Sequence, residues 1–126
     1  MKERKGILCT GWAVKLSFSN KTFPNWKVRK FVLTKYAFNY SDDQFFVKGT
    51  YDRRHLGNAE AISPQEVPNW ESCLFTLDFP FPVRLWIKEQ PFYFAVSTQQ
   101  EQIEWIIALN NQPLSRPNES PEPGIF

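Results

Sequence analysis

The chain has 126 residues, enough for one domain that buries a hydrophobic core of its own. Aromatic residues make up 17% of it, which argues against disorder over most of its length, and its uncharged runs are too short to span a bilayer. The net charge of +2 conceals an asymmetry, because residues 1–35 hold nine Lys and Arg against one Glu, whereas residues 36–126 hold six against twelve Asp and Glu. A basic first third followed by an acidic remainder favours an anionic partner.

Alternation of apolar and polar residues predicts β-strands over most of the chain. The first is expected at residues 12–18, and residues 19–25 are predicted as a loop because they are rich in Asn, Lys, Thr and Pro. Further strands are expected at residues 26–33, 35–41, 46–51, 73–77, 83–87 and 92–96. The short links between them predict antiparallel hairpins. Residues 53–69 are the least regular stretch, and no strand is predicted there.

The period of the pattern changes after residue 97. Thr98 and Glu101 have the spacing of a helix-capping box, and the helix is expected to stop before Pro113. Its predicted apolar stripe consists of Ile103, Ile106, Ile107 and Asn110, flanked by Trp105 and Leu109. Residues 112–126 are rich in Pro, Ser, Asn and Glu and are predicted to form a disordered linker or tail.

Seven strands and one terminal helix predict a mainly β domain, an antiparallel barrel or sandwich with a C-terminal helix across one open end. Trp12, Trp86 and Trp105 are expected in its core.

The sequence offers no set of residues for catalysis. It lacks a G-x-S-x-G motif, a glycine-rich phosphate loop and a cluster of metal ligands. Cys9, Cys73 and the single His55 are too few for a zinc site, and the two thiols fit a reducing cytosol. We therefore expect a binding module rather than an enzyme, without a cofactor or metal.

Cations placed on the predicted strands form the candidate site. Lys27 and Arg29 share one face of the second strand with Phe31 and Leu33, and the apolar pair is expected to lie deeper. An antiparallel hairpin can bring Lys15 beside the two cations, at the rim of a barrel. Cations crowded at one rim repel one another unless an anion lies between them, and Arg and Lys suit phosphate. The alternative is a solvated basic face without a ligand.

Two further residues extend this candidate site. Lys21 lies in the loop that connects the first two strands, and Tyr40 ends the third strand, where its hydroxyl can reach the same rim.

The order of several short motifs resembles that of a pleckstrin homology (PH) domain. The matching runs are residues 11–16 (GWAVKL), 26–34 (WKVRKFVLT), 38–40 (FNY) and 48–51 (KGTY), together with Trp105 in the final helix. The resemblance covers about residues 5–111 and implies a seven-stranded, bent antiparallel barrel capped by the C-terminal helix. Residues 25–29, 34–35, 79–82 and 91–94 are similar to those of the Tec-family tyrosine kinases.

Phosphoinositide-binding members of that family carry a basic motif across the first two strands and a Tyr at the end of the third. The residues at those positions are Lys15, Lys27, Arg29 and Tyr40. The resemblance implies that Lys15 and Arg29 hold a 3-phosphate, that Tyr40 donates to a neighbouring phosphate, the 4-phosphate, and that Lys27 flanks the headgroup. Lys48 is a further candidate. The implied ligands are 3-phosphorylated phosphoinositides, either the 3,4,5-trisphosphate or the 3,4-bisphosphate, or soluble inositol phosphates.

The expected function is membrane recruitment in signalling, by a cytoplasmic protein that is peripheral at the plasma membrane and is also attracted to anionic lipid. The alternative is a protein-interaction module on the same fold, which binds a peptide at a sheet edge or against the helix and uses Phe45, Phe46 and Trp70. Nucleic acid is not expected as a partner, because the basic residues form one cluster in an otherwise acidic chain.

Overall fold

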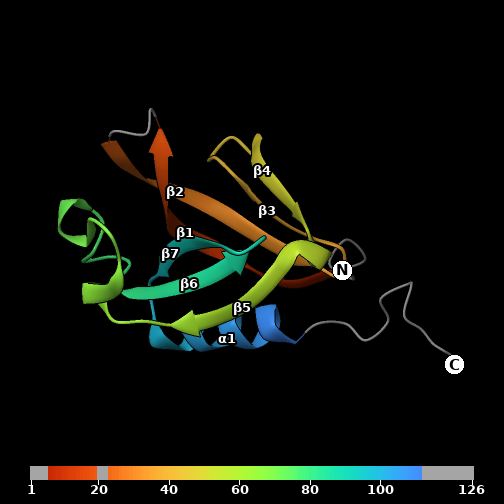
Figure 1. The fold of residues 1–126 in the computed structure, drawn as a ribbon. Helices are drawn as coiled ribbons and strands as arrows, with labels where there is room; N and C mark the ends of the chain where they lie inside the picture. The colour runs from red at the N-terminus through yellow and green to blue at the C-terminus, as the bar shows by residue number, and fades with distance from the viewer. Residues whose placement is uncertain (1–5, 20–22, 112–126) are drawn as a thin grey trace, which may run out of the picture.

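The computed structural model describes residues 6–19 and 23–111. Seven antiparallel strands form one sheet in the order β4-β3-β2-β1-β7-β6-β5, and a single α-helix follows them (Figure 1). The strands are β1 (Ile7–Ser19), β2 (Phe23–Thr34), β3 (Ala37–Ser41), β4 (Val47–Asp52), β5 (Leu56–Ala61), β6 (Phe81–Ile87) and β7 (Gln90–Val96), and the helix α1 is Gln99–Asn110. The predicted mainly β fold with seven strands and a C-terminal helix is confirmed.

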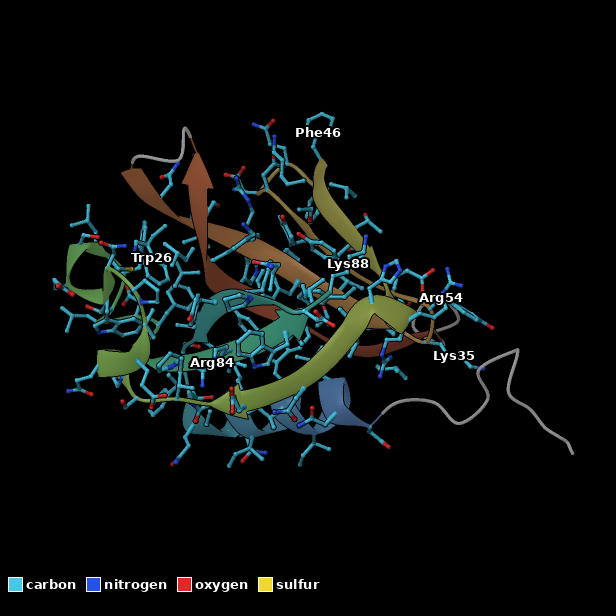
Figure 2. The ribbon with its side chains drawn as sticks, in the orientation of Figure 1. Trp26, Lys35, Phe46, Arg54, Arg84 and Lys88 are labelled. Carbon is cyan, nitrogen blue, oxygen red and sulfur yellow. The ribbon has the colours of Figure 1, made fainter. Side chains whose placement is uncertain are left out.

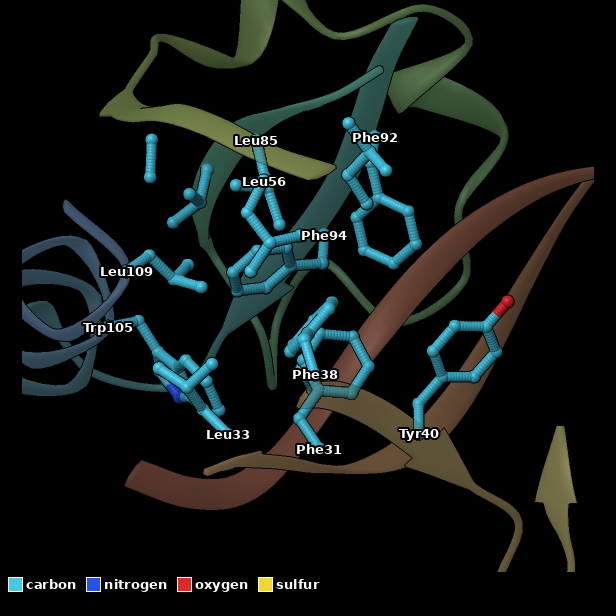
Figure 3. Close-up of a cluster of buried hydrophobic side chains, with 14 of the residues drawn as sticks. Phe31, Leu33, Phe38, Tyr40, Leu56, Leu85, Phe92, Phe94, Trp105 and Leu109 are labelled. Atoms are coloured by element: carbon cyan, nitrogen blue, oxygen red, sulfur yellow. The ribbon is translucent and has the colours of Figure 1, made fainter. Parts of the chain in front are cut away.

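The sheet bends around a hydrophobic cluster, the main core, in which aromatic rings meet edge to face. Phe31 contacts Phe38, Phe94 and Trp105 with ring centroids 4.9–5.9 Å apart, a favourable arrangement for aromatic pairs. Helix α1 covers one end of this cluster, and Tyr40 and Phe92 lie at the other end (Figure 3). The main core therefore has a covered end and an end away from the helix.

A second, smaller cluster lies on the outer face of β1. The connection between β5 and β6, residues 62–80, folds over this face and contains the short helices η3 (Pro64–Glu66) and η4 (Trp70–Ser72). The buried members of the cluster are Val14, Leu16, Trp26, Ile62, Val67, Cys73 and Ala95. Trp26 stands edge-on to Trp70 at 5.9 Å and donates its ring N–H to the Asn69 carbonyl at 3.2 Å. The middle of β1 is therefore covered on both faces.

The strand predicted at residues 73–77 is wrong. Cys73 and Phe75 turn into the second cluster, whereas Leu74 and Leu77 are almost fully exposed. The following strand, β6, has both edges occupied, by β5 and β7. Alternation in this segment reflects packing of a connection onto β1 rather than pairing in a sheet.

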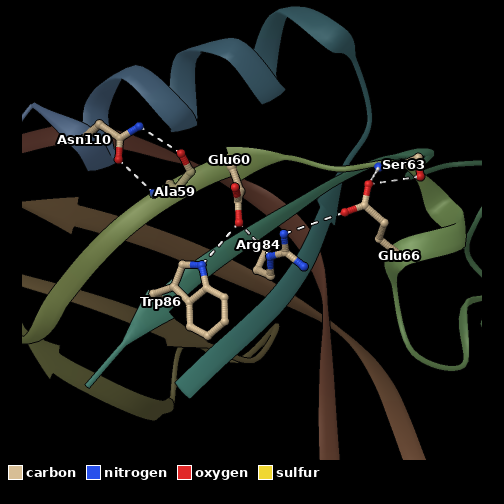
Figure 4. A network of polar contacts seen from close by, with 7 residues as sticks. All are labelled: Ala59, Glu60, Ser63, Glu66, Arg84, Trp86 and Asn110. Carbon is tan, nitrogen blue, oxygen red and sulfur yellow. Dashed lines mark hydrogen bonds and ion pairs between the residues drawn. The ribbon is translucent and has the colours of Figure 1, made fainter. Parts of the chain in front are cut away.

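The seventh strand is β5, in the stretch where no strand was predicted. Its sequence, LGNAEA, is poor in the β-branched and aromatic residues typical of strands. Contacts with distant residues hold it extended: Glu60 forms an ion pair with Arg84 at 2.7 Å, and the Asn110 side chain bonds both the N–H and the C=O of Ala59 at 2.8 and 2.9 Å (Figure 4). Tertiary contacts therefore stabilise the extended conformation of β5, although its sequence has a low β-propensity.

Helix α1 begins at the predicted cap. The Thr98 hydroxyl accepts a hydrogen bond from the Glu101 N–H at 3.1 Å. The Glu101 carboxylate, however, accepts from the backbone N–H and hydroxyl of Ser97 rather than from Thr98.

The buried face of α1 differs from the predicted stripe. Its buried residues are Gln102, Trp105 and Leu109, whereas Ile103 and Ile107 are exposed. Of the three tryptophans expected in the core, Trp105 is there, but Trp12 is exposed and Trp86 is only partly buried. No helix in the described part of the chain is long and apolar enough to cross a membrane.

Candidate functional site

Two lysines face each other near the hairpin end of the β1–β2 pair. Lys15 of β1 is directly opposite Lys27 of β2, and Ala13 is opposite Arg29. Since residues two apart on a strand share a face, all three cations lie on one face of the sheet. Further along β2 on that face, Phe31 and Leu33 are fully buried. The predicted juxtaposition of the cations with a deeper apolar pair is confirmed, and we call Lys15, Lys27 and Arg29 the cationic mouth.

Lys15 is the buried member of the cationic mouth, with 8% of its surface exposed. Its ammonium donates to the Ser17 hydroxyl at 3.0 Å and lies 4.9 Å from the ring centroid of Tyr40 and 5.3 Å from that of Phe92. Aromatic faces attract a cation at this distance. Burial, together with the charge of Arg29, lowers the pKa of Lys15 to about 8. Lys15 is therefore a poorly hydrated cation at the end of the core away from α1.

Tyr40 supports this ammonium and itself depends on Gly49, its direct partner across β3 and β4. A methyl group on Gly49 would overlap the hydroxyl and ring of Tyr40, so the tyrosine occupies the space where a side chain would stand. Burial and the neighbouring phenol of Tyr51 raise the pKa of Tyr40 to about 12. The hydroxyl therefore keeps its proton at neutral pH. Sequence reasoning assigned Gly49 no role, although a glycine inside a strand often marks a close approach.

The other two predicted site residues, Lys48 and Lys21, are not part of the cationic mouth as the structure describes it. Lys48 is exposed, and its ammonium lies 3.8 Å from a carboxylate oxygen of Asp42. Strand alternation places it on the face of β4 opposite that of Gly49, so it does not face into the cationic mouth. Lys21 lies outside the described residues.

The cations of the cationic mouth are not ion-paired among the described residues. By contrast, Arg54 pairs with Asp52 at 3.0 Å and Arg84 with Glu60. Arg29 donates one guanidinium N–H to the adjacent Val28 carbonyl at 3.2 Å. Like charges directly opposite on a sheet are destabilising. An anion bound between them would remove this repulsion.

The turn between β3 and β4 presents an apolar tip, formed by Phe45, Phe46 and Val47. Phe45 and Phe46 are 71% and 64% exposed. The φ angle of Phe45 is 67°, a left-handed conformation that is unusual for a bulky residue. One oxygen of Asp42 holds the turn by accepting from the N–H groups of Gln44 and Phe46 at 2.9 and 3.0 Å. The turn therefore exposes its aromatic residues at a cost in backbone strain.

The apolar tip and the cationic mouth are on the same side of the molecule. The ends of β1 and β2 and the β3–β4 turn project to one side, and α1 lies on the opposite side (Figure 1). Phe46 stands at the outer end of the turn (Figure 2). The amides of Phe46 and Gln44, and the cations Lys48 and Arg29, hold the pKa of Asp42 below its usual range. The charge of Arg29 is the smallest of these effects on Asp42.

The described residues can also be compared with what a metal site or a reactive thiol needs. They contain no group of three or more His, Cys, Asp or Glu side chains that could hold a metal ion. Burial and the charge of Glu104 raise the pKa of the Cys9 thiol to about 11, and burial also raises that of Cys73. Neither thiol is activated as a nucleophile at neutral pH.

Comparison with known proteins identifies the fold. The sequence model of the PH domain family matches residues 7–112. The structure is similar to that of the C-terminal PH domain of human pleckstrin, with 23% identity, a TM-score of 0.62 and coverage of 89% of this chain and 93% of that one. It is also similar to the C-terminal PH domain of human pleckstrin 2, with 23% identity, a TM-score of 0.63 and coverage of 94% and 91%. A search of curated proteins gave no match.

Proposed function

Because this chain belongs to the PH domain family, whose members are generally non-catalytic modules that bind lipids or proteins, we propose that it recruits its parent protein to a membrane by binding a phosphoinositide headgroup. The proposed ligands are the 3,4,5-trisphosphate and the 3,4-bisphosphate of phosphatidylinositol. In this proposal Lys15 and Arg29 hold the 3-phosphate, and Lys27 flanks the inositol ring. The ring of Tyr40 contacts the ammonium of Lys15, and its phenol donates a hydrogen bond to a neighbouring phosphate.

The observation that carries the proposal is the unpaired crowding of charge at the cationic mouth. Lys15 lies opposite Lys27, Arg29 follows on the same face, and no described carboxylate pairs with any of them. Each charge-assisted hydrogen bond to phosphate contributes about 1.5–3 kcal/mol. Three or four such bonds support binding in the micromolar range after the entropic costs of association.

The apolar tip favours a lipid over a free inositol phosphate as the natural ligand. Phe45, Phe46 and Val47 are exposed beside the cationic mouth, and aromatic side chains are stable at the boundary between headgroups and acyl chains. A soluble headgroup would leave these side chains in water. The cytoplasmic leaflet of the plasma membrane carries anionic lipids, which attract the basic part of the chain as well. We therefore propose a peripheral location at that membrane.

Titration calorimetry with inositol 1,3,4,5-tetrakisphosphate tests the site. Arg29→Ala is expected to abolish measurable binding, because it removes the one bidentate phosphate donor of the cationic mouth. Arg54→Ala is the matched control, since Arg54 is exposed and paired with Asp52. Unchanged affinity of Arg29→Ala would refute the assignment of the site. Flotation with vesicles that contain each phosphoinositide then ranks the lipids, and a folded protein that floats with none of them would refute membrane recruitment.

A further inference from the structure

Along the first half of β1, one edge has no partner strand among residues 6–19 and 23–111. Strand β7 pairs with β1 at Val14 and Lys15. From Ile7 to Ala13 the edge away from β2 pairs with no strand in the described part of the chain. Backbone N–H and C=O groups of an antiparallel strand point alternately to its two edges. This half of β1 therefore presents free backbone groups on the side of α1, a template for another strand.

A groove runs between this edge and α1. Its volume is about 600 Å³, and its walls are formed by Ile7, Leu8, Cys9 and Thr10 of β1 and by Glu104, Ile107, Ala108 and Asn111 on the helix side. Leu8 is 51% exposed and Ile107 60%. The groove thus joins an unpaired strand edge to apolar side chains on both walls, which are the two features that an extended peptide needs.

The corresponding edge of β5 is closed. Strand β5 also contacts α1, and there the Asn110 side chain bonds both the N–H and the C=O of Ala59, as a residue of a neighbouring strand would (Figure 4). The hydrogen bonds of the described residues include none of this kind between a side chain of α1 and the backbone of residues 7–13. Of the two strand edges beside the helix, that of β1 remains open.

The groove is acidic on its helix side. Glu104 lines it, and α1 contains two Glu residues and no Lys or Arg. Their charges reach across the groove, since Glu104 and Glu101 add to the effect of burial in raising the pKa of Cys9 on β1. The carbonyls of Ala108 and Asn111 at the C-terminal end of α1 accept hydrogen bonds from the Arg53 guanidinium at 3.1 and 3.2 Å, so the negative charge of the groove comes from the Glu side chains. An occupant that carries a cation complements this surface.

We propose that the groove binds an extended, basic and apolar peptide segment of a partner protein. The peptide pairs its backbone with β1 as an added strand, packs an apolar side chain between Leu8 and Ile107, and directs a Lys or Arg to Glu104. The site is independent of headgroup binding, because Leu8 and Lys15 are separated by about 23 Å of strand at 3.3 Å per residue. Both sites can be occupied at once.

Selection from a library of random nine-residue peptides, displayed on phage, tests the proposal. We expect enrichment of sequences that alternate apolar residues and contain at least one Lys or Arg. A synthetic peptide from the enriched set is then titrated into the whole chain by calorimetry. Ile107→Glu and Glu104→Lys are each expected to weaken binding at least tenfold. Ile103→Glu is the matched control, because Ile103 is also exposed, lies one helical turn earlier and does not line the groove.

Hydrogen exchange locates the bound peptide. Amides of residues 7–10 are expected to exchange more slowly in the complex, whereas those of the β4 edge are unchanged. The proposal is overturned if no peptide is enriched, if Ile107→Glu binds as tightly as the control, or if protection appears at β4. Leu8→Asp on the opposite wall gives a second variant in case a helix substitution unfolds the chain, and it is expected to weaken binding to the same extent.

Discussion

The phenol of Tyr40 lies in the space that a side chain on Gly49 would fill. The two residues are direct partners across β3 and β4, and the ring of Tyr40 in turn lies 4.9 Å from the ammonium of Lys15. Gly49, on the edge strand β4, thereby affects the position of Lys15, the buried cation of the cationic mouth.

Substitution of Gly49 tests this dependence. Gly49→Ala is expected to push the ring of Tyr40 aside, to destabilise the fold by about 1–3 kcal/mol and to weaken binding of inositol tetrakisphosphate several-fold. Urea denaturation and calorimetry measure the two effects. Gly11→Ala is the control, because an added methyl there meets only the Trp105 ring nitrogen, at 4.0 Å. Equal behaviour of the two variants would show that Tyr40 is not held by the absence of a side chain at position 49.

The pKa of Lys15 predicts a pH dependence of binding. In the free protein this pKa is lowered to about 8, first by burial, and a bound phosphate is expected to raise it again. Above pH 8 the free lysine is neutral, so binding must take up a proton, and affinity should fall by up to about tenfold per pH unit. Calorimetry at pH 7, 8 and 9 checks this, and Lys15→Met should bind weakly with no such slope. A wild-type affinity that is constant up to pH 9 would contradict the prediction.

Burial of the same lysine should cost stability. Because its folded pKa lies below the ordinary value of 10.5, the unfolded chain binds more protons between pH 8 and 10.5, and stability rises with pH across that window. Lys15→Met is accordingly expected to stabilise the free protein at pH 7, on the order of 2 kcal/mol. Thermal unfolding at several pH values measures both trends. Destabilisation by Lys15→Met would mean that the contacts of the ammonium outweigh its desolvation.

The apolar tip should act on vesicles but not on soluble ligand. Replacement of both Phe45 and Phe46 by Ser is expected to weaken binding to phosphoinositide vesicles by roughly 10–100-fold, because each ring loses its burial in the interface. Affinity for inositol tetrakisphosphate should stay within about twofold by the same reasoning. Ile103→Ser, on the helix at the other side of the molecule, serves as the control. Unchanged vesicle binding would show that the tip remains in water.

The hydrogen bonds from the Asn110 side chain of α1 to Ala59 of β5 should contribute to stability. Asn110→Ala removes two hydrogen bonds to Ala59 and is expected to destabilise the chain by about 1–3 kcal/mol. The backbone amide of Ala59 should then exchange faster with solvent. Asn111→Ala, a substitution at an exposed neighbouring position, gives the comparison. If Asn110→Ala is as stable as this control, water forms the two lost hydrogen bonds to Ala59 at no cost in stability.

Strand parity explains how much of the site could be predicted. The alternation of β2 places Lys27 and Arg29 on the face of Phe31, and antiparallel pairing with β1 brings Lys15 opposite Lys27. Both are local properties of the sequence. The roles of Gly49 and Asp42 depend on where the Tyr40 ring and the β3–β4 turn come to lie, which no local pattern records.

The fold shows the same division. The strands with clear alternation were predicted, whereas β5 was missed because its extended state depends on Arg84 and Asn110, both distant in sequence. Residues 73–77 show a strand-like pattern because Cys73 and Phe75 pack the connection onto β1. The predicted buried face of α1 is wrong because apolar residues occur around the whole helix. Which of them are buried depends on how Trp105 and Leu109 fit into the main core.

The second cluster has a consequence for how a ligand meets the cationic mouth. Since residues 62–80 cover the outer face of β1 while the main core covers the inner one, the backbone that carries Lys15 is fixed before any ligand arrives. Association then spends little entropy on ordering the strand. Trp70→Ala, in a connection that need not touch the headgroup, should accordingly reduce affinity through increased backbone disorder. Evolutionary selection for ligand binding would then act on the basic residues and also on positions such as Trp70, which is more than 50 residues from Lys15 in the sequence.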